Sequence, residues 1–153
     1  MKPINVGDVA PDFTVVASNG QTVRLSEFRG KQSVVLFFYP GDNTPICTKE
    51  ACSFRDAYED FLKLGAVVIA VSADSNETHQ KFAAEKKLPF LMIADQDNAL
   101  RKLFGVSNVM FLFPRRITYL IDRDGIVRSK FNSQLSGTEH VTQALQTLRE
   151  IAS

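Results

Sequence analysis

The chain has 153 residues, of which 44% are hydrophobic, and its 18 basic and 17 acidic side chains leave a formal charge of +1. A chain of this length buries roughly two thirds of its unfolded surface in one core, so we expect a single domain over residues 1–153. The near-neutral charge lacks the basic field of a nucleic-acid binder, and no apolar run approaches the ~20 residues that span a membrane. Small molecules or proteins are therefore the expected class of partner.

The first part of the chain predicts a β-hairpin followed by a buried strand. FTVV (13–16) and TVRL (22–25) alternate with period two and flank Asn19 and Gly20, which predicts a two-residue turn because both residues accept positive φ. SVVLFFY (33–39) is a continuous apolar run, typical of a strand covered on both faces.

Residues 44–64 change to the spacing of a helix. Pro45 suits the first turn, where its missing N–H has no partner to lose, and Gly65 ends the helix. Apolar residues recur at steps of three and four and can share one stripe: Ala51, Phe54, Tyr58, Phe61 and Leu62.

Strands and helices alternate through the rest of the chain. We expect a strand over AVVIAVS (66–72), a helix from an N-cap at Ser75 to Lys87, and further elements at 91–94 (strand), 98–104 (helix), 117–121 and 126–131 (a hairpin), and 138–151 (helix). This order predicts an α/β fold with a mixed central sheet flanked by helices and an N-terminal β-hairpin.

Both cysteines, Cys47 and Cys52, fall in the predicted helix 44–64. In the first turn of a helix, free N–H groups and the helix dipole favour an anion, so the pKa of a thiol there is drawn below its usual value of about 8.5. Five residues of helix separate the two Cα atoms by about 8–9 Å, whereas a disulfide needs less than about 7 Å. The spacing argues against a preformed bond and permits one that forms when the helix partly unwinds.

Other interpretations of the pair stay open at this point. A buried cysteine is a common small hydrophobic residue, and a dithiol exchanger normally has C-x-x-C. A metal site needs three or four ligands, and His79 and His140 are both expected on polar, solvent-facing sides of helices. Two cysteines are too few for a secreted, disulfide-stapled scaffold, so a cytoplasmic location is favoured, although a plastid protein whose leader has been removed is an alternative.

Pro40, Thr44 and Cys47 form P-x-x-x-T-x-x-C, which resembles the active-site motif of the peroxiredoxins, thiol peroxidases with a thioredoxin-like fold. GDVAPDF (7–13) and RRITYLIDRDG (115–125) resemble their counterparts in order and spacing, so the resemblance covers nearly the whole chain. A second cysteine five residues after the first is similar to the peroxiredoxin Q, or bacterioferritin-comigratory, subfamily.

The resemblance implies an antioxidant peroxidase that reduces hydrogen peroxide and organic hydroperoxides. Cys47 would be the peroxidatic cysteine and become a sulfenic acid, with Thr44 orienting the peroxide and Pro40 shielding the site from water. Arg116 would bind the substrate and stabilise both the thiolate and the departing oxygen. Cys52 would be the resolving cysteine of an intramolecular disulfide, which thioredoxin or a glutaredoxin-like donor reduces. No cofactor or metal is implied, and the chain is expected to be a monomer.

Several positions depart from this pattern or admit another interpretation. Ile46 stands where the subfamily often has glycine, and Arg115 is the alternative to its neighbour Arg116. Glu50 could position the arginine, but we expect it at the surface. The apolar NVMFLFP (108–114) either packs on the core or forms a collar that favours bulky hydroperoxides. The competing functions are a general disulfide oxidoreductase and a redox-sensing module.

Overall fold

The computed structural model describes residues 4–39, 45–95, 97, 99–106, 108–109, 113–114, 116–132 and 137–152. Its strands are β1 (Thr14–Val16), β2 (Thr22–Arg24), β3 (Ser33–Phe38), β4 (Ala66–Ser72), β5 (Leu91–Ala94), β6 (Asn108–Val109), β7 (Phe113–Pro114), β8 (Ile117–Ile121) and β9 (Val127–Asn132). Its helices are the 3-10 turn η1 (Leu25–Phe28), α1 (Pro45–Asp56), α2 (Tyr58–Lys63), α3 (Asn76–Lys86), α4 (Ala99–Phe104) and α5 (Gly137–Ala152). Among these, no helix is both long and apolar enough to cross a membrane.

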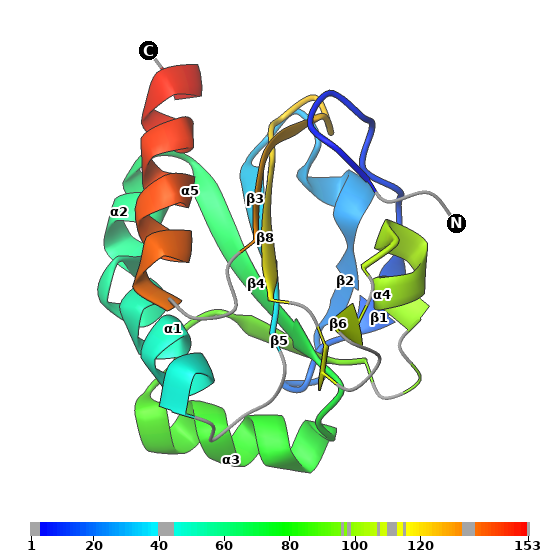
Figure 1. Cartoon of the computed structure of the whole chain (residues 1–153), viewed down its shortest axis with the longest axis vertical. Coiled ribbons are helices and arrows are strands. Elements are labelled where there is room, and N and C mark those ends of the chain that lie inside the picture. Colours follow the sequence, from blue (N-terminus) through cyan, green and yellow to red (C-terminus); the bar gives the residue numbers. More distant parts are fainter. Residues whose placement is uncertain are drawn as a thin grey trace.

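The central sheet has five strands in the order β5-β4-β3-β8-β9 (Figure 1). β3 runs parallel to β4, and β4 parallel to β5, whereas β8 is antiparallel to both β3 and β9. The predicted mixed sheet is therefore confirmed. Phe38, near the end of β3, pairs with Val71 near the end of β4 and with Ile117 at the start of β8. This register brings the carboxyl ends of two strands and the amino end of a third to one edge of the sheet.

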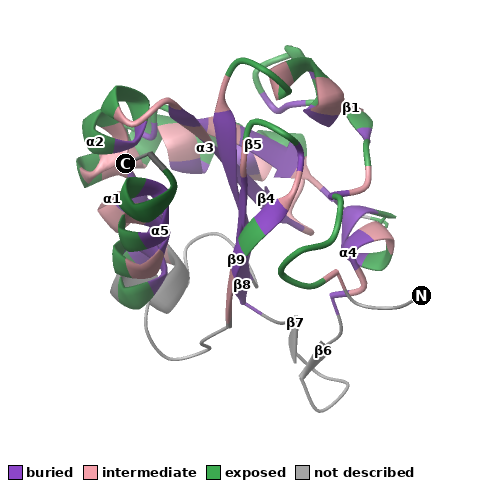
Figure 2. Ribbon diagram, turned by 90° about the horizontal axis from the view of Figure 1, so that it is seen from above, coloured by how far each residue is buried: buried purple, intermediate pink, exposed green. Residues whose placement is uncertain are grey.

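Two apolar cores lie on the two faces of the sheet. Every residue of β3 is buried, as expected of a strand covered on both sides, and its side chains alternate between the two faces. Figure 2 shows the buried residues, in purple, running along the strands of the central sheet, with α1, α2 and α5 on one side of it and α4 on the other. One core joins Val34, Leu36 and Phe38 to residues of the N-terminal hairpin and α4. The other joins Val35 and Phe37 to residues of α1, α2, α3 and α5.

α1 is fixed to the sheet by an aromatic contact. The rings of Phe54 and Phe37 stack with their centroids 4.4 Å apart and their planes 13° from parallel. Burying a phenylalanine side chain stabilises a fold by about 1.5–3 kcal/mol. The helix that carries both cysteines therefore has a firm anchor in its second half.

Two local predictions need correction. The helix expected over 44–64 is interrupted at Ala57, whose ψ of 1° lies outside the helical range, so α1 and α2 are separate helices. The hairpin turn is longer than two residues: Ala17 donates its N–H to the Gln21 carbonyl, and Gly20 takes a positive φ of 88° but Asn19 does not. A two-residue turn with positive φ at both positions is thus ruled out.

Candidate active site

The edge of the sheet where β3 ends and β8 begins is the expected place of the site. Cys47 is the third residue of α1, in the predicted first turn, and Cys52 lies on the same helix as a free, partly buried thiol. The side chain of Cys47 lies outside what the structure describes, as do Pro40 and Thr44. The site is therefore described below through the side chains of α1 that the structure shows and the residues that contact them.

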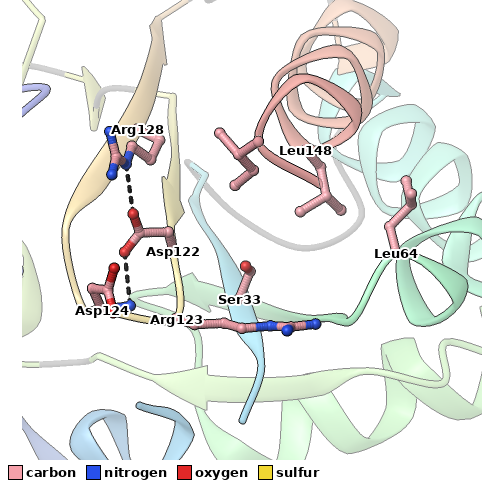
Figure 3. A pocket seen from close by; sticks show the side chains of 8 residues that line it. Ser33, Leu64, Asp122, Arg123, Asp124, Arg128 and Leu148 are labelled. Carbon is pink, nitrogen blue, oxygen red and sulfur yellow. Dashed lines mark hydrogen bonds and ion pairs between the residues drawn. The ribbon is translucent and has the colours of Figure 1, made fainter. Parts of the chain in front are cut away.

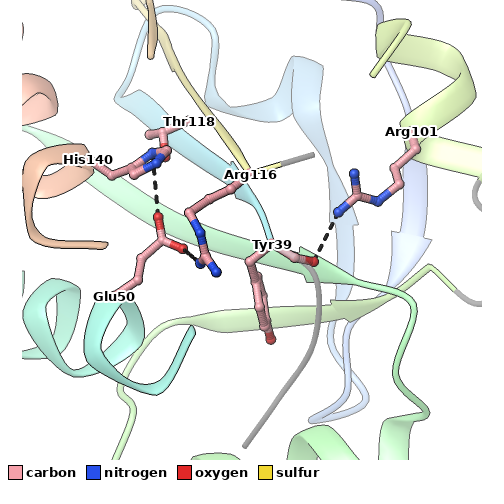
Figure 4. Close-up of polar contacts among 6 residues, drawn as sticks. All are labelled: Tyr39, Glu50, Arg101, Arg116, Thr118 and His140. Atoms are coloured by element: carbon pink, nitrogen blue, oxygen red, sulfur yellow. Dashed lines mark hydrogen bonds and ion pairs between the residues drawn. The ribbon is translucent and has the colours of Figure 1, made fainter. Parts of the chain in front are cut away.

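A buried ion pair joins α1 to the start of β8. Arg116 is 2% exposed and Glu50 is fully buried, and the Arg116 Nη1 donates to Glu50 Oε1 at 2.5 Å (Figure 4). The prediction of a surface glutamate is wrong, because position 50 is four residues from the buried Phe54 and shares its helix face. The pair fixes the arginine that the motif analysis selected.

His140 and Thr118 extend this pair to α5. The Nδ1 of His140 lies 3.5 Å from Glu50 Oε2 and shares a hydrogen bond of 2.7 Å with the Thr118 hydroxyl. His140 is fully buried in the first turn of α5, so its expected exposure to solvent is wrong. We call Glu50, Arg116, Thr118 and His140 the buried polar cluster; it connects α1, β8 and α5.

His79 is also buried, against the prediction of a solvent-facing side chain. Its Nε2 lies 3.1 Å from the Ile93 carbonyl and 3.3 Å from the Ser72 hydroxyl, and its Nδ1 lies 3.5 Å from the Tyr39 hydroxyl. The ring takes part in polar contacts inside the fold rather than in a metal site. In the part of the chain that the structure describes, no three His, Cys, Asp or Glu side chains gather in a group that could hold a metal ion.

A cavity of about 350 Å³ lies at the other end of the sheet (Figure 3). It is bordered by Ser33 at the start of β3, by the turn between β8 and β9, and by Leu148 of α5. Asp122 closes that turn, because its carboxylate accepts from the N–H groups of Asp124 and Ile126 and pairs with Arg128 at 2.5 Å. Six residues of strand, about 20 Å, separate this cavity from the end of β3, so it does not belong to the cysteine site.

Comparison with known proteins gives the family. The AhpC/TSA family model matches residues 6–130. The chloroplastic peroxiredoxin Q of Sedum lineare is 43% identical over 149 residues, covering 97% of this chain and 80% of that protein, and that of Arabidopsis thaliana is 44% identical over 147 residues, covering 95% and 68%. The chain is a peroxiredoxin of the Q subfamily.

Solved structures agree with this assignment. Peroxidoxin BcpB of Mycobacterium tuberculosis superimposes with a TM-score of 0.89 and 35% identity, covering 98% of this chain and 99% of that one. A Xylella fastidiosa PrxQ variant matches with a TM-score of 0.89 and 27% identity over the whole of both chains. The bacterioferritin comigratory protein of Xanthomonas campestris (TM-score 0.86, 26% identity, 98% of both chains) was solved for insight into its alkyl peroxide reduction activity. The predicted thioredoxin-like fold is confirmed, and the family supports thiol-dependent peroxidase activity.

Within this peroxiredoxin, Glu50 has an unusual proton affinity. Burial raises the pKa of its carboxyl to about 8, and the neighbouring Arg116 cation opposes that rise. One oxygen, Oε2, has no hydrogen-bond partner among the described residues. The carboxyl therefore changes its charge near pH 8, next to the buried Arg116.

We expect Glu50→Gln to remove a pH dependence of stability. Glu50 has a pKa of about 8 in the folded protein against 4.5 ordinarily, so the folded state binds a proton more tightly over this window. The stability that Glu50 contributes is full below pH 4.5 and is lost as the pH rises through 8, with a slope of at most about 1.4 kcal/mol per pH unit.

Urea unfolding at pH 5, 6, 7 and 8 checks this prediction. The free energy of unfolding of the wild type, minus that of Glu50→Gln, should fall steadily across the series. Glu59→Gln, at an exposed position of α2, is the matched control and should show no such fall. A wild-type minus Glu50→Gln difference that stays constant with pH would contradict the raised pKa.

Proposed function

We propose that Cys47 reduces hydrogen peroxide and organic hydroperoxides, and that Cys52 resolves the resulting sulfenic acid as an intramolecular disulfide. The observation that supports this most is the buried pair of Arg116 with Glu50, on the helix that carries both cysteines. Positions 47 and 50 are three residues apart in α1, the spacing of neighbours on one helix face. The guanidinium is therefore held against the face of α1 to which position 47 belongs.

The first chemical step uses the position of Cys47 and the charge of Arg116. Free N–H groups in the first turn of α1 favour a thiolate at position 47. The thiolate electron pair forms an S–O bond with one peroxide oxygen while the O–O bond breaks, and the departing oxygen takes up a proton and leaves as water or an alcohol. Arg116 stabilises the negative charge on both sulfur and the departing oxygen. Thr44 orients the peroxide and Pro40 excludes water, as the family motif implies.

The second step requires α1 to open. Cys47 and Cys52 lie in one helix, so about 8–9 Å separates their Cα atoms until the helix unwinds. The Cys52 thiol then condenses with the sulfenic acid, which forms the S–S bond and releases water. The break at Ala57 supports this step, because α1 can unwind without disturbing α2. Thioredoxin or a glutaredoxin-like donor then reduces the disulfide.

The proposal extends to the substrates and the location of the protein, on the evidence of its relatives. The alkyl peroxide reduction activity of the Xanthomonas campestris relative supports organic hydroperoxides as substrates. The chloroplastic names of the plant relatives support a plastid location alongside the cytoplasm that two cysteines favour. The residues 110–112 of the apolar segment 108–114, and every side chain in it, lie outside the described part, so its proposed collar stays a prediction.

Thiol counting tests the proposed cycle directly. After one equivalent of hydrogen peroxide, we expect both thiols to be lost within one chain, because the sulfenic acid on Cys47 condenses with Cys52. Mass analysis without reductant should show a monomer lighter by the two thiol hydrogens. The Cys52→Ser variant is the control and should gain one oxygen instead. A disulfide-linked dimer, or a chain that keeps Cys52 free, would contradict the intramolecular cycle.

A further inference from the structure

We infer that Arg101 is a positioning residue for the peroxidase site: it fixes the carbonyl of Tyr39 and, through it, the chain that leads to Pro40 and Thr44. This inference rests on the proposed function of Cys47. Arg101 lies in α4, on the sheet face opposite α1, and took no part in the mechanism above. Figure 4 shows the guanidinium of Arg101 directed at the Tyr39 carbonyl and that of Arg116 paired with Glu50, on the other side of Tyr39 in this view.

The guanidinium of Arg101 is buried and makes a directed contact. Arg101 is 2% exposed, and its Nη2 donates to the Tyr39 carbonyl at 2.9 Å. Its central carbon lies 5.5 Å from the centroid of the Phe38 ring, within the range of a cation–π contact. A buried cation is unfavourable unless it is paired and hydrogen-bonded. The Tyr39 carbonyl and the Phe38 ring, at the end of β3, are two of the contacts that stabilise this buried cation.

The main chain of Arg101 is itself held in place. Asp95 is 3% exposed, and its carboxylate accepts from the N–H groups of Leu100 at 2.9 Å and Arg101 at 3.1 Å, as an N-terminal cap of α4 does. The N–H of Asp95 donates to the Ser72 carbonyl at the end of β4. The base of the arginine side chain is therefore tied to the same edge of the sheet as the carbonyl that it contacts.

Tyr39 is held at its other end by His79. The Tyr39 hydroxyl lies 3.5 Å from His79 Nδ1, and the ring of His79 is fixed by its contact with the Ile93 carbonyl. With the side chain held, the contact from Arg101 determines how the carbonyl is turned. A peptide unit is planar, so the direction of this carbonyl sets the plane that includes the nitrogen of Pro40.

The orientation of this plane matters because the proposed peroxide pocket begins there. Misplacing reacting groups by about 1 Å can slow a reaction a hundredfold. Arg101 acts through Tyr39 and is not assigned to the reacting atoms. Its loss should therefore slow the reaction with peroxide, which needs an oriented substrate, and leave the intrinsic reactivity of the Cys47 thiolate nearly unchanged.

Two reactions of the same thiol separate these effects. In a Cys52→Ser background Cys47 is the sole thiol, and its rate of sulfenic acid formation with hydrogen peroxide is compared with its rate of alkylation by iodoacetamide. We expect Arg101→Met to lower the peroxide rate about 10- to 100-fold and the alkylation rate less than about twofold. Arg101→Lys should fall between, because it keeps the charge but not the planar guanidinium. Lys102→Met, an exposed neighbour on α4, is the matched control.

The results that would overturn the role of Arg101 differ from the result that would contradict the proposed role of Cys47. An unchanged peroxide rate in Arg101→Met would overturn the inference, and so would an equal fall in both rates, which indicates a general structural effect. Should Arg101→Met fail to fold, Arg101→Lys carries the same comparison, and a peroxide rate equal to that of the parent would overturn the inference. A Cys52→Ser parent that is alkylated but forms no sulfenic acid would instead contradict the role of Cys47.

Discussion

Replacing Cys47 with serine is expected to abolish peroxide consumption, with a loss of at least about three orders of magnitude in rate. Serine supplies no thiolate, so the S–O bond cannot form. Cys52→Ser should behave differently: it forms one equivalent of sulfenic acid and then stops, because no resolving thiol is present. Peroxide consumption with a thioredoxin system, combined with trapping of the sulfenic acid by dimedone and mass analysis, measures both expectations.

The different roles that we propose for the two cysteines follow from their positions in α1. Cys47 is the third residue, within the turn whose N–H groups have no partner in the helix. Cys52 is the eighth residue, where a helical N–H already bonds to the carbonyl four residues earlier. The free N–H groups of the first turn therefore favour a thiolate at position 47. Equal peroxide consumption by the two serine variants would contradict this assignment.

Buried strands were the part of the fold that the sequence predicted best. The structure has β4, β5 and β8 with the predicted limits of 66–72, 91–94 and 117–121. A strand that is buried on both faces is apolar along its whole length, and polar residues begin where the helices and loops that bury it end. Its limits are therefore marked in the sequence. The break at Ala57 left no such sign, since the apolar spacing of α1 continues into α2.

The polar residues of the site were harder to place than its motif. Glu50, His79 and His140 were assigned to the surface by their polarity, but each lies three or four residues from a buried apolar residue of its own helix: Glu50 with Phe54, His79 with Phe82, and His140 with Ala144. That spacing was a usable signal. Glu50 is named above as a residue that could position the arginine, but the sequence does not decide between this role and the surface, because Arg116 is 66 residues away and the two meet only through the sheet register.

Arg116→Met is expected to slow the reaction with peroxide a hundredfold to a thousandfold, by analogy with the loss of one preorganised group that stabilises a developing charge. It should also destabilise the fold by up to about 3–5 kcal/mol, because Glu50 loses its buried partner. Stopped-flow rates of sulfenic acid formation and urea unfolding at pH 6 and pH 8 measure the two effects. Arg115→Met is the matched control. A larger loss of peroxide rate in Arg115→Met than in Arg116→Met would assign the charge-stabilising role to Arg115 instead.

A double variant separates the two effects of Arg116. Without the arginine, only burial acts on Glu50, so its pKa rises above 8 and the folded variant still holds the Glu50 proton at pH 8, where the wild type begins to release it. The unfolded chain has lost this proton at pH 8, so holding it costs the variant more stability than it costs the wild type. The destabilisation of Arg116→Met should therefore be greater at pH 8. Adding Glu50→Gln removes the buried carboxyl and the cost of keeping it protonated, and should restore most of the stability while the peroxide rate stays low. If the double variant recovers rate and stability together, Arg116 stabilises the fold and not the transition state.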